Sequence, residues 1–86
     1  MVLGAGYTQI PLYEAARRLG VTTVACSIKG NYDGFAHADE ISYTDISDPE
    51  AVTAACRKYS VDGVATCGLD LGMRAIGHAC EELGLL

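Results

Sequence analysis

The chain has 86 residues, half of them apolar and 20% charged, and its formal net charge is −5. This composition predicts one compact globular domain over residues 1–86, excludes a disordered chain and argues against nucleic acid as a partner. The sequence has neither an apolar run of the roughly 18 residues that a membrane span requires nor a signal peptide after Met1, so we expect no membrane partner.

The first predicted element is a strand over residues 1–3, which leads into a loop that contains Gly4 and Gly6. A helical pattern follows Thr8, and the backbone N–H groups of such a loop suit an anion such as phosphate or carboxylate. The G-x-G-x-x-G pattern of dinucleotide-binding loops would put a third glycine at position 9, where Gln9 stands. We expect its side chain to obstruct the close approach of a pyrophosphate, and a purely structural tight turn is the alternative.

Three stretches carry apolar residues at the helical spacing i, i+3, i+4, i+7, and each is predicted to form a helix with one buried face. The apolar positions are Leu12, Ala15, Ala16 and Leu19 in the first, Val52, Ala55, Cys56 and Tyr59 in the second, and Met73, Ile76, Gly77 and Cys80 in the third.

The predicted ends of these helices carry capping residues. We expect Thr8 to cap the first helix and Ser47 to cap the second, in a capping box with Glu50. Gly20 and Gly84 stand where a left-handed residue ends a helix.

Three further segments rich in branched apolar residues, 22–27, 40–44 and 63–66, are predicted to be strands. Strands that alternate with helices predict right-handed crossovers and a parallel sheet covered on both faces, which is a Rossmann-like three-layer α/β/α fold with strand order 3-2-1-4. In such sheets ligands bind beyond the carboxyl ends of the strands. The loops after the first and fourth strands should therefore lie side by side.

The loop after the fourth strand reads Cys67-Gly68-Leu69-Asp70. Gly68 permits a tight turn, and Asp70 either caps the third helix or contacts a ligand. Cys67 should point toward the same crevice, but no base is near it in the sequence, which disfavours a nucleophilic role. We therefore expect no catalytic residue here.

The end of the second strand tests the dinucleotide hypothesis, because an acidic residue there normally holds the ribose of NAD. The residues are Ser27, Ile28 and Lys29, without a carboxylate, although Lys29 could serve a 2′-phosphate. A Rossmann-type NAD(P)- or nucleotide-binding module therefore remains the alternative function.

The cysteines and histidines do not predict a metal site. Four cysteines without a CxxC pair favour a reduced, cytoplasmic setting, and zinc would need more converging ligands. His37 precedes the third strand and His78 is predicted on a solvated helix face. Tyr32-Asp33-Gly34 is predicted to be a turn.

The chain resembles the N-terminal, pre-ATP-grasp domain of ATP-grasp ligases. Such ligases include biotin carboxylase, the large subunit of carbamoyl phosphate synthetase and the ATP-dependent ligases of purine synthesis. The resemblance covers essentially the full chain, and its GAGYTQIPL start is similar to those of a carbamoyl phosphate synthetase large subunit-like branch. It rests on the GAG opening, on Ala38-Asp39-Glu40 before the third strand, on Val61-Asp62-Gly63-Val64 and on the glycine turn after Thr66.

The resemblance implies that this domain closes one side of the acceptor-substrate pocket of an ATP-dependent carboxylate–amine or related ligase. ATP and Mg²⁺ would be bound by the remaining ATP-grasp domains of a longer polypeptide, so the 86 residues would be inactive alone. Besides those domains, the implied partners are a small-molecule acceptor and a possible second copy of the chain. The implied substrate-facing residues are Gly4, Gly6, Tyr7, Thr8 and Gln9 in the first loop and Gly68, Leu69 and Asp70 in the second.

A third hypothesis is a stand-alone sensor or interaction domain without a substrate. It would be removed if the reading frame continued for some 200 residues into an ATP-grasp region.

Overall fold

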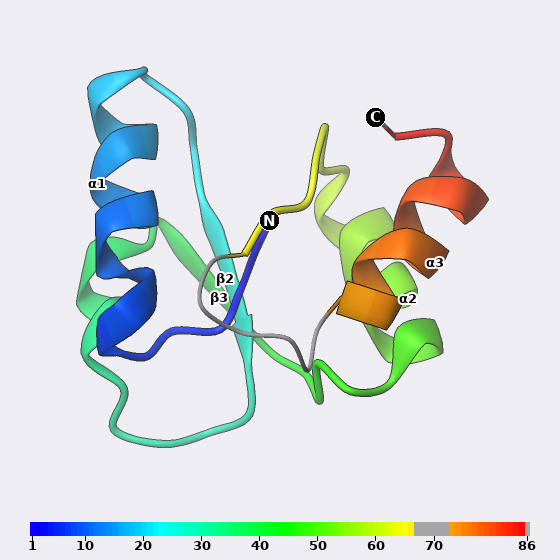
Figure 1. The fold of residues 1–86 in the computed structure, drawn as a ribbon, viewed down its shortest axis with the longest axis horizontal. Helices are drawn as coiled ribbons and strands as arrows, with labels where there is room; N and C mark the ends of the chain where they lie inside the picture. Colours follow the sequence, from blue (N-terminus) through cyan, green and yellow to red (C-terminus); the bar gives the residue numbers. More distant parts are fainter. Residues whose placement is uncertain (67–72, 86) are drawn as a thin grey trace.

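The structure is a computed structural model that describes residues 1–66 and 73–85. The β-strands are β1 (Val2–Leu3), β2 (Val24–Ser27) and β3 (Glu40–Tyr43), the α-helices are α1 (Ile10–Arg18), α2 (Pro49–Tyr59) and α3 (Met73–Leu83), and two 3-10 helices are η1 (Tyr7–Gln9) and η2 (Asp33–His37). Helix α1 lies on one side of the strands, and α2 and α3 lie on the other (Figure 1). The predicted three-layer α/β/α fold is confirmed.

The sheet is parallel, and β2 is its central strand. The predicted fourth strand at 63–66 is instead a single parallel bridge between Ala65 and Val2. Ala65 donates to the Met1 carbonyl and accepts from the Leu3 amide, both at 2.9 Å. The ladder stops there because β1 has only two residues and Gly4, at φ +93°, turns the chain out of the strand. The order 3-2-1 is therefore observed, with residue 65 on the free edge of β1.

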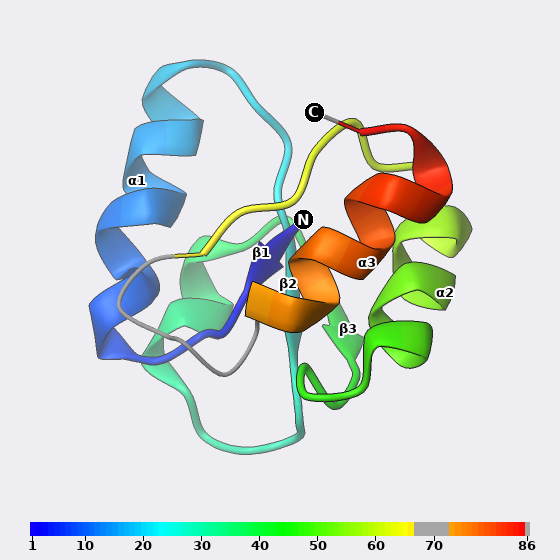
Figure 2. The same ribbon diagram turned by 45° about the vertical axis from the view of Figure 1, so that its right-hand side comes forward.

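The strands bury alternate side chains on opposite faces of the sheet, as the period of two in a strand requires. Leu3 and Cys26 belong to the core cluster that packs against α2 and α3. Val2 and Ala25 belong to a smaller cluster beneath α1, which contains Tyr13 and borders η2. Figure 2 shows α2 and α3 packed side by side over the first of these faces.

Two of the predicted N-caps are wrong. Helix α2 is capped by Asp48, whose carboxylate accepts from the amides of Glu50 and Ala51. Ser47 instead donates to Asp45, because the backbone turn at 45–48 brings these two side chains together. Helix α1 follows η1 without a break, so its N-cap is Gln9 rather than Thr8.

The predicted C termini are confirmed. Gly20 and Gly84 have φ angles of 73° and 68°, in the left-handed region that glycine adopts without strain. Helix α3 therefore ends at Leu83 as the pattern indicates.

The predicted apolar stripe of α1 is only half-buried. Tyr13, which is not part of the stripe, is the buried residue of α1, whereas Leu19 is 79% exposed. The stripe lines an open groove of about 510 Å³, whose other wall is residues 59–65. Helical spacing predicted the helix correctly, but not how much of its face the sheet would cover. No helix among the described residues is long and apolar enough to cross a membrane.

Candidate functional site

The loop of residues 4–9 begins where β1 ends, and Gly4 fixes this turn. Its φ of +93° is unfavourable for residues with a Cβ. Its amide donates to the Cys26 carbonyl at 2.8 Å, and its carbonyl accepts from the buried Tyr13 hydroxyl at 2.7 Å. Burial raises the pKa of Tyr13, so the phenol remains a neutral donor beneath the loop. We conclude that Gly4 is required by backbone geometry.

Gly6 and Gln9 form a closed hydrogen-bonded turn. The Gln9 amide donates to the Gly6 carbonyl at 3.1 Å, and the Gly6 amide donates to Gln9 Oε1 at 2.9 Å. Gln9 Nε2 donates to Thr8 Oγ1 at 2.9 Å. The Gln9 side chain is only 4% exposed, so it lies beneath the loop rather than in the way of an approaching ligand.

Segment η2 packs against the same loop without a side chain between the two backbones. The Gly34 amide donates to the Ala5 carbonyl at 2.7 Å, and a Cβ on Gly34 would lie 2.5 Å from that oxygen. The turn predicted at 32–34 is therefore the start of a 3-10 helix that supports the loop. The sequence signal was the glycine after Tyr32-Asp33. Glycine is common both in turns and where two backbones approach closely, so the signal did not distinguish the two.

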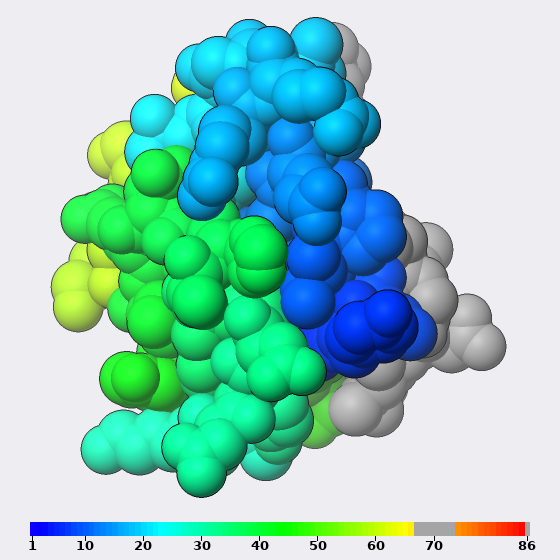
Figure 3. All heavy atoms as spheres, turned by 90° about the vertical axis from the view of Figure 1, so that its left-hand side faces the viewer, coloured from blue at the N-terminus to red at the C-terminus, as the bar shows by residue number. Residues whose placement is uncertain are grey.

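Tyr7 carries the large exposed side chain of the loop, next to the exposed Thr8. Tyr7 is 79% exposed. Figure 3 shows atoms of the first ten residues, in dark blue, at the surface between α1 and the green atoms of η2.

Further apolar side chains are exposed near the carboxyl ends of β2 and β3. Tyr32 and Tyr43 are 37% and 55% exposed, and each ring packs edge-on against Phe35, with centroids 5.7 and 5.8 Å apart. Lys29 Nζ lies 5.6 Å from the centre of the Tyr43 ring. The ammonium group of Lys29, which could have bound a 2′-phosphate, therefore lies over an aromatic ring.

The second predicted loop begins next to the first. Thr66 Oγ1 donates to the Leu3 carbonyl at 2.7 Å, one residue before Gly4. Cys67, Gly68, Leu69 and Asp70 lie outside the described residues, so their approach to Gly6 stays a prediction.

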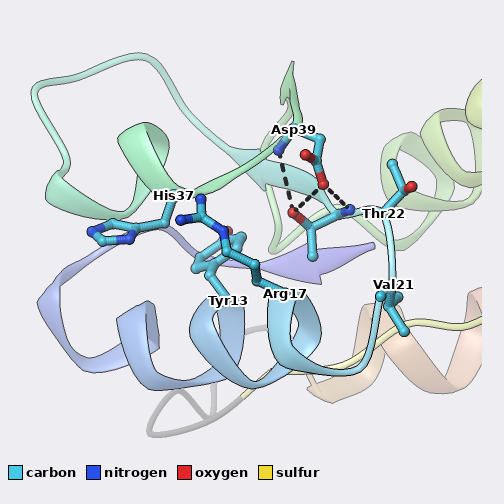
Figure 4. A pocket seen from close by; sticks show the side chains of 8 residues that line it. Tyr13, Arg17, Val21, Thr22, His37 and Asp39 are labelled. Atoms are coloured by element: carbon cyan, nitrogen blue, oxygen red, sulfur yellow. Dashed lines mark hydrogen bonds between the residues drawn. The ribbon is translucent and has the colours of Figure 1, made fainter.

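The Ala38-Asp39-Glu40 element lies at the opposite end of the sheet. Asp39 Oδ2 accepts from the Thr23 amide at 2.7 Å and from the Thr23 hydroxyl at 3.2 Å. The Asp39 amide donates to the same hydroxyl oxygen at 3.2 Å. These bonds join the starts of β2 and β3 and border a cavity of about 210 Å³ into which Arg17 and His37 project (Figure 4). The element holds the sheet in register.

His78 was predicted on a solvated helix face, and its side chain is 35% exposed, but the ring also contacts α2. Its Nδ1 lies 2.9 Å from Thr53 Oγ1, and its Nε2 lies 3.9 Å from a Glu50 oxygen. The 25-residue spacing between Thr53 and His78 gives no sequence signal for this contact. Among the residues that the structure describes, no group of three His, Cys, Asp or Glu side chains could hold a metal ion.

Two of the described cysteines behave as small apolar core residues. Cys26 on β2 and Cys56 on α2 are buried in the same core cluster, and burial raises the pKa of the Cys26 thiol to about 11. A thiol with so high a pKa is protonated at neutral pH, which makes it a poor nucleophile.

Two solved structures are similar to this chain along nearly its whole length. A phosphoribosylglycinamide synthetase from Anaerococcus prevotii is 40% identical with a TM-score of 0.93, over 99% of this chain and 22% of that one. The glycinamide-RNase-transformylase T of Mycobacterium tuberculosis is 23% identical with a TM-score of 0.79, over 95% of this chain and 24% of that one, and this likeness concerns the fold alone.

The chain thus spans less than a quarter of the length of either solved protein. No curated protein matched it. The family model of the ATP-grasp N-terminal domain matches residues 13–85, which include α1 from Tyr13 onward, the strands β2 and β3, and both later helices. The chain therefore belongs to the ATP-grasp N-terminal domain family.

Proposed function

We propose that these residues form the substrate-side N-terminal domain of an ATP-dependent ligase that makes a carbon–nitrogen bond. The observation that carries the proposal is the alignment of the whole domain, at 40% identity, with a phosphoribosylglycinamide synthetase. That name describes a product in which an amine is joined to the carboxyl group of glycine. The sequence resemblance pointed instead to the carbamoyl phosphate synthetase-like branch, so the proposal concerns the reaction class rather than one substrate.

In this proposal ATP converts a carboxylate into an acyl phosphate, which an amine then attacks. ATP and Mg²⁺ are bound by other ATP-grasp domains of the same polypeptide, and the described part of this chain offers no carboxylate cluster for the metal. The relation between the 86 residues and the much longer synthetase supports this division, because the domain corresponds to 22% of that chain. The domain by itself is inactive.

The loop of residues 4–9 forms part of the acceptor pocket in this proposal. Its position at the carboxyl end of β1 is where parallel sheets bind ligands, and the exposed side chain of Tyr7 supports the same role. The bond from Thr66 to Leu3 supports a shared rim with the loop that contains Gly68, Leu69 and Asp70. Gly6, Tyr7 and Thr8 border this rim, whereas Gly4 and Gln9 shape it from below.

The test uses the complete protein encoded by the gene. We expect phosphate release from ATP only when a carboxylate and an amine are both present, with glycine and phosphoribosylamine as the first pair. The 86-residue chain serves as the control and should release none. Absence of turnover with any carboxylate and amine pair, together with micromolar binding of NADPH by the 86-residue chain in a calorimetric titration, would favour the dinucleotide-binding alternative.

A further inference from the structure

Gln9 occupies the third glycine position of the loop pattern that holds a diphosphate in dinucleotide-binding folds. In the G-x-G-x-x-G pattern the second glycine lets the backbone approach the pyrophosphate, whose oxygens accept from amides at the helix N-terminus. Gly6 is the second glycine of that pattern, and Gln9 replaces the third.

The Gly6 amide already has an acceptor that belongs to the chain. Gln9 Oε1 lies 2.9 Å from this nitrogen, close to the usual distance of an N–H···O hydrogen bond. The oxygen rather than the nitrogen of the Gln9 amide must face Gly6, because both nitrogens are donors. Nε2 donates in turn to Thr8 Oγ1, which holds the amide group in this orientation.

Burial makes this arrangement durable. The Gln9 side chain is 4% exposed, and even a Cβ on Gly6 would approach Oε1 to 3.2 Å. An outside ligand could reach the Gly6 amide only by displacing Oε1 from this hydrogen bond inside a buried turn, which is costly.

We propose that Gln9 is a specificity-determining residue whose side-chain oxygen takes the place of a phosphate oxygen at the Gly6 amide and so excludes nucleotide diphosphates from the loop. This inference rests on the proposed function, in which the loop is open to a ligand. It adds a reason why a loop of this shape does not bind the diphosphate of a nucleotide. Exclusion comes from a hydrogen bond inside the loop and not from a side chain standing in the ligand's path.

The test is a titration of the ¹⁵N-labelled 86-residue chain with inorganic pyrophosphate at constant ionic strength, followed at the Gly6 amide by NMR. The wild-type amide should not respond. Gln9→Gly should give a saturable shift at pyrophosphate concentrations at least about tenfold below the highest one at which the wild-type amide stays unchanged, because a donor to a charged acceptor becomes available. Gln9→Met is the matched variant, since it keeps the side-chain length and removes the acceptor; it should also respond.

Three results would overturn the proposal. The wild-type amide could respond as strongly as that of Gln9→Gly, both folded variants could stay silent, or Gln9→Met alone could stay silent, which would make the exclusion steric. If the variants do not fold, hydrogen exchange of the wild-type Gly6 amide decides: the proposal requires protection, and exchange at the rate of an unstructured peptide contradicts it. The titration involves no ligase turnover, so its failure is distinct from failure of the proposed function.

Discussion

Backbone hydrogen bonds occur at both ends of the parallel sheet, but the two ends differ in the further contacts that support them. At the amino ends, a carboxylate and a hydroxyl connect β2 to β3 through Asp39 and Thr23. At the carboxyl ends, backbones touch directly, since Gly34 bonds to Ala5 and Gly4 bonds to Cys26. Side-chain contacts require specific polar residues, whereas close backbone contacts require that no side chain be present. A polar residue such as Asp39 and a glycine such as Gly4 can therefore look like part of a functional motif in the sequence while they support the fold.

The largest expected effect comes from the backbone contact at Gly34. In Gly34→Ala the new Cβ would lie 2.5 Å from the Ala5 oxygen and 2.8 Å from its carbon, so η2 and the loop must separate. We expect a loss of about 3 kcal/mol in the free energy of unfolding, as for strong overpacking. Urea denaturation measures it.

Gly77→Ala is the matched control for this change. No atom lies within 4 Å of a Cβ at Gly77, which is inside α3, so alanine should stabilise the chain by about 0.5 to 1 kcal/mol. Equal losses in both variants would mean that the contact between Gly34 and Ala5 does not support the loop.

A smaller loss is expected at Gly4, where the backbone conformation requires glycine. Gly4→Ala must either adopt a φ near +93° or move the chain, at a cost of about 2 kcal/mol. Gly6→Ala is the comparison, because Gly6 has a φ of −76° that any residue adopts. In thermal unfolding, the Tm of Gly4→Ala should be clearly lower than that of Gly6→Ala. The reverse order would contradict the placement of the strained turn at Gly4.

The sequence predicted the layers of the fold because alternation and helical spacing depend on local residues. It did not predict the bond from Gly34 to Ala5 or the contact of His78 with Thr53, which join residues distant in the chain. Periodicity also carries no information on how far a neighbouring element extends, so the burial of Leu19 was overestimated.

For the candidate site, the sequence predicted the loop after the first strand and showed that Gln9 stands in place of a third glycine. It could not predict that the Gln9 side chain would turn inward. The second loop of the candidate site, with Gly68, Leu69 and Asp70, lies outside the described residues.

At the amino ends we expect an effect of about 1 kcal/mol. Thr23→Val keeps the shape of a buried side chain but removes the hydroxyl that bonds twice to Asp39, while the bond from the Thr23 amide remains. Thr22→Val, at an exposed neighbouring position, should change the free energy of unfolding by less than about 0.5 kcal/mol. If chemical denaturation finds the two variants equally stable, the Asp39 contact does not hold the register of β2 and β3.

The smallest effect on stability, and the most informative one for function, is expected at Tyr7. Its side chain is 79% exposed on the loop, so Tyr7→Ala should leave the free energy of unfolding within about 0.5 kcal/mol of wild type. In the proposed ligase the same change should raise KM for the acceptor and leave KM for ATP unchanged, because the proposal places the acceptor, and not ATP, at this rim. Steady-state kinetics with each substrate varied in turn separates these constants. A rise in KM for ATP alone would indicate that the nucleotide binds at the carboxyl end of β1. The backbone contacts beneath the loop would then support a nucleotide site instead of an acceptor pocket.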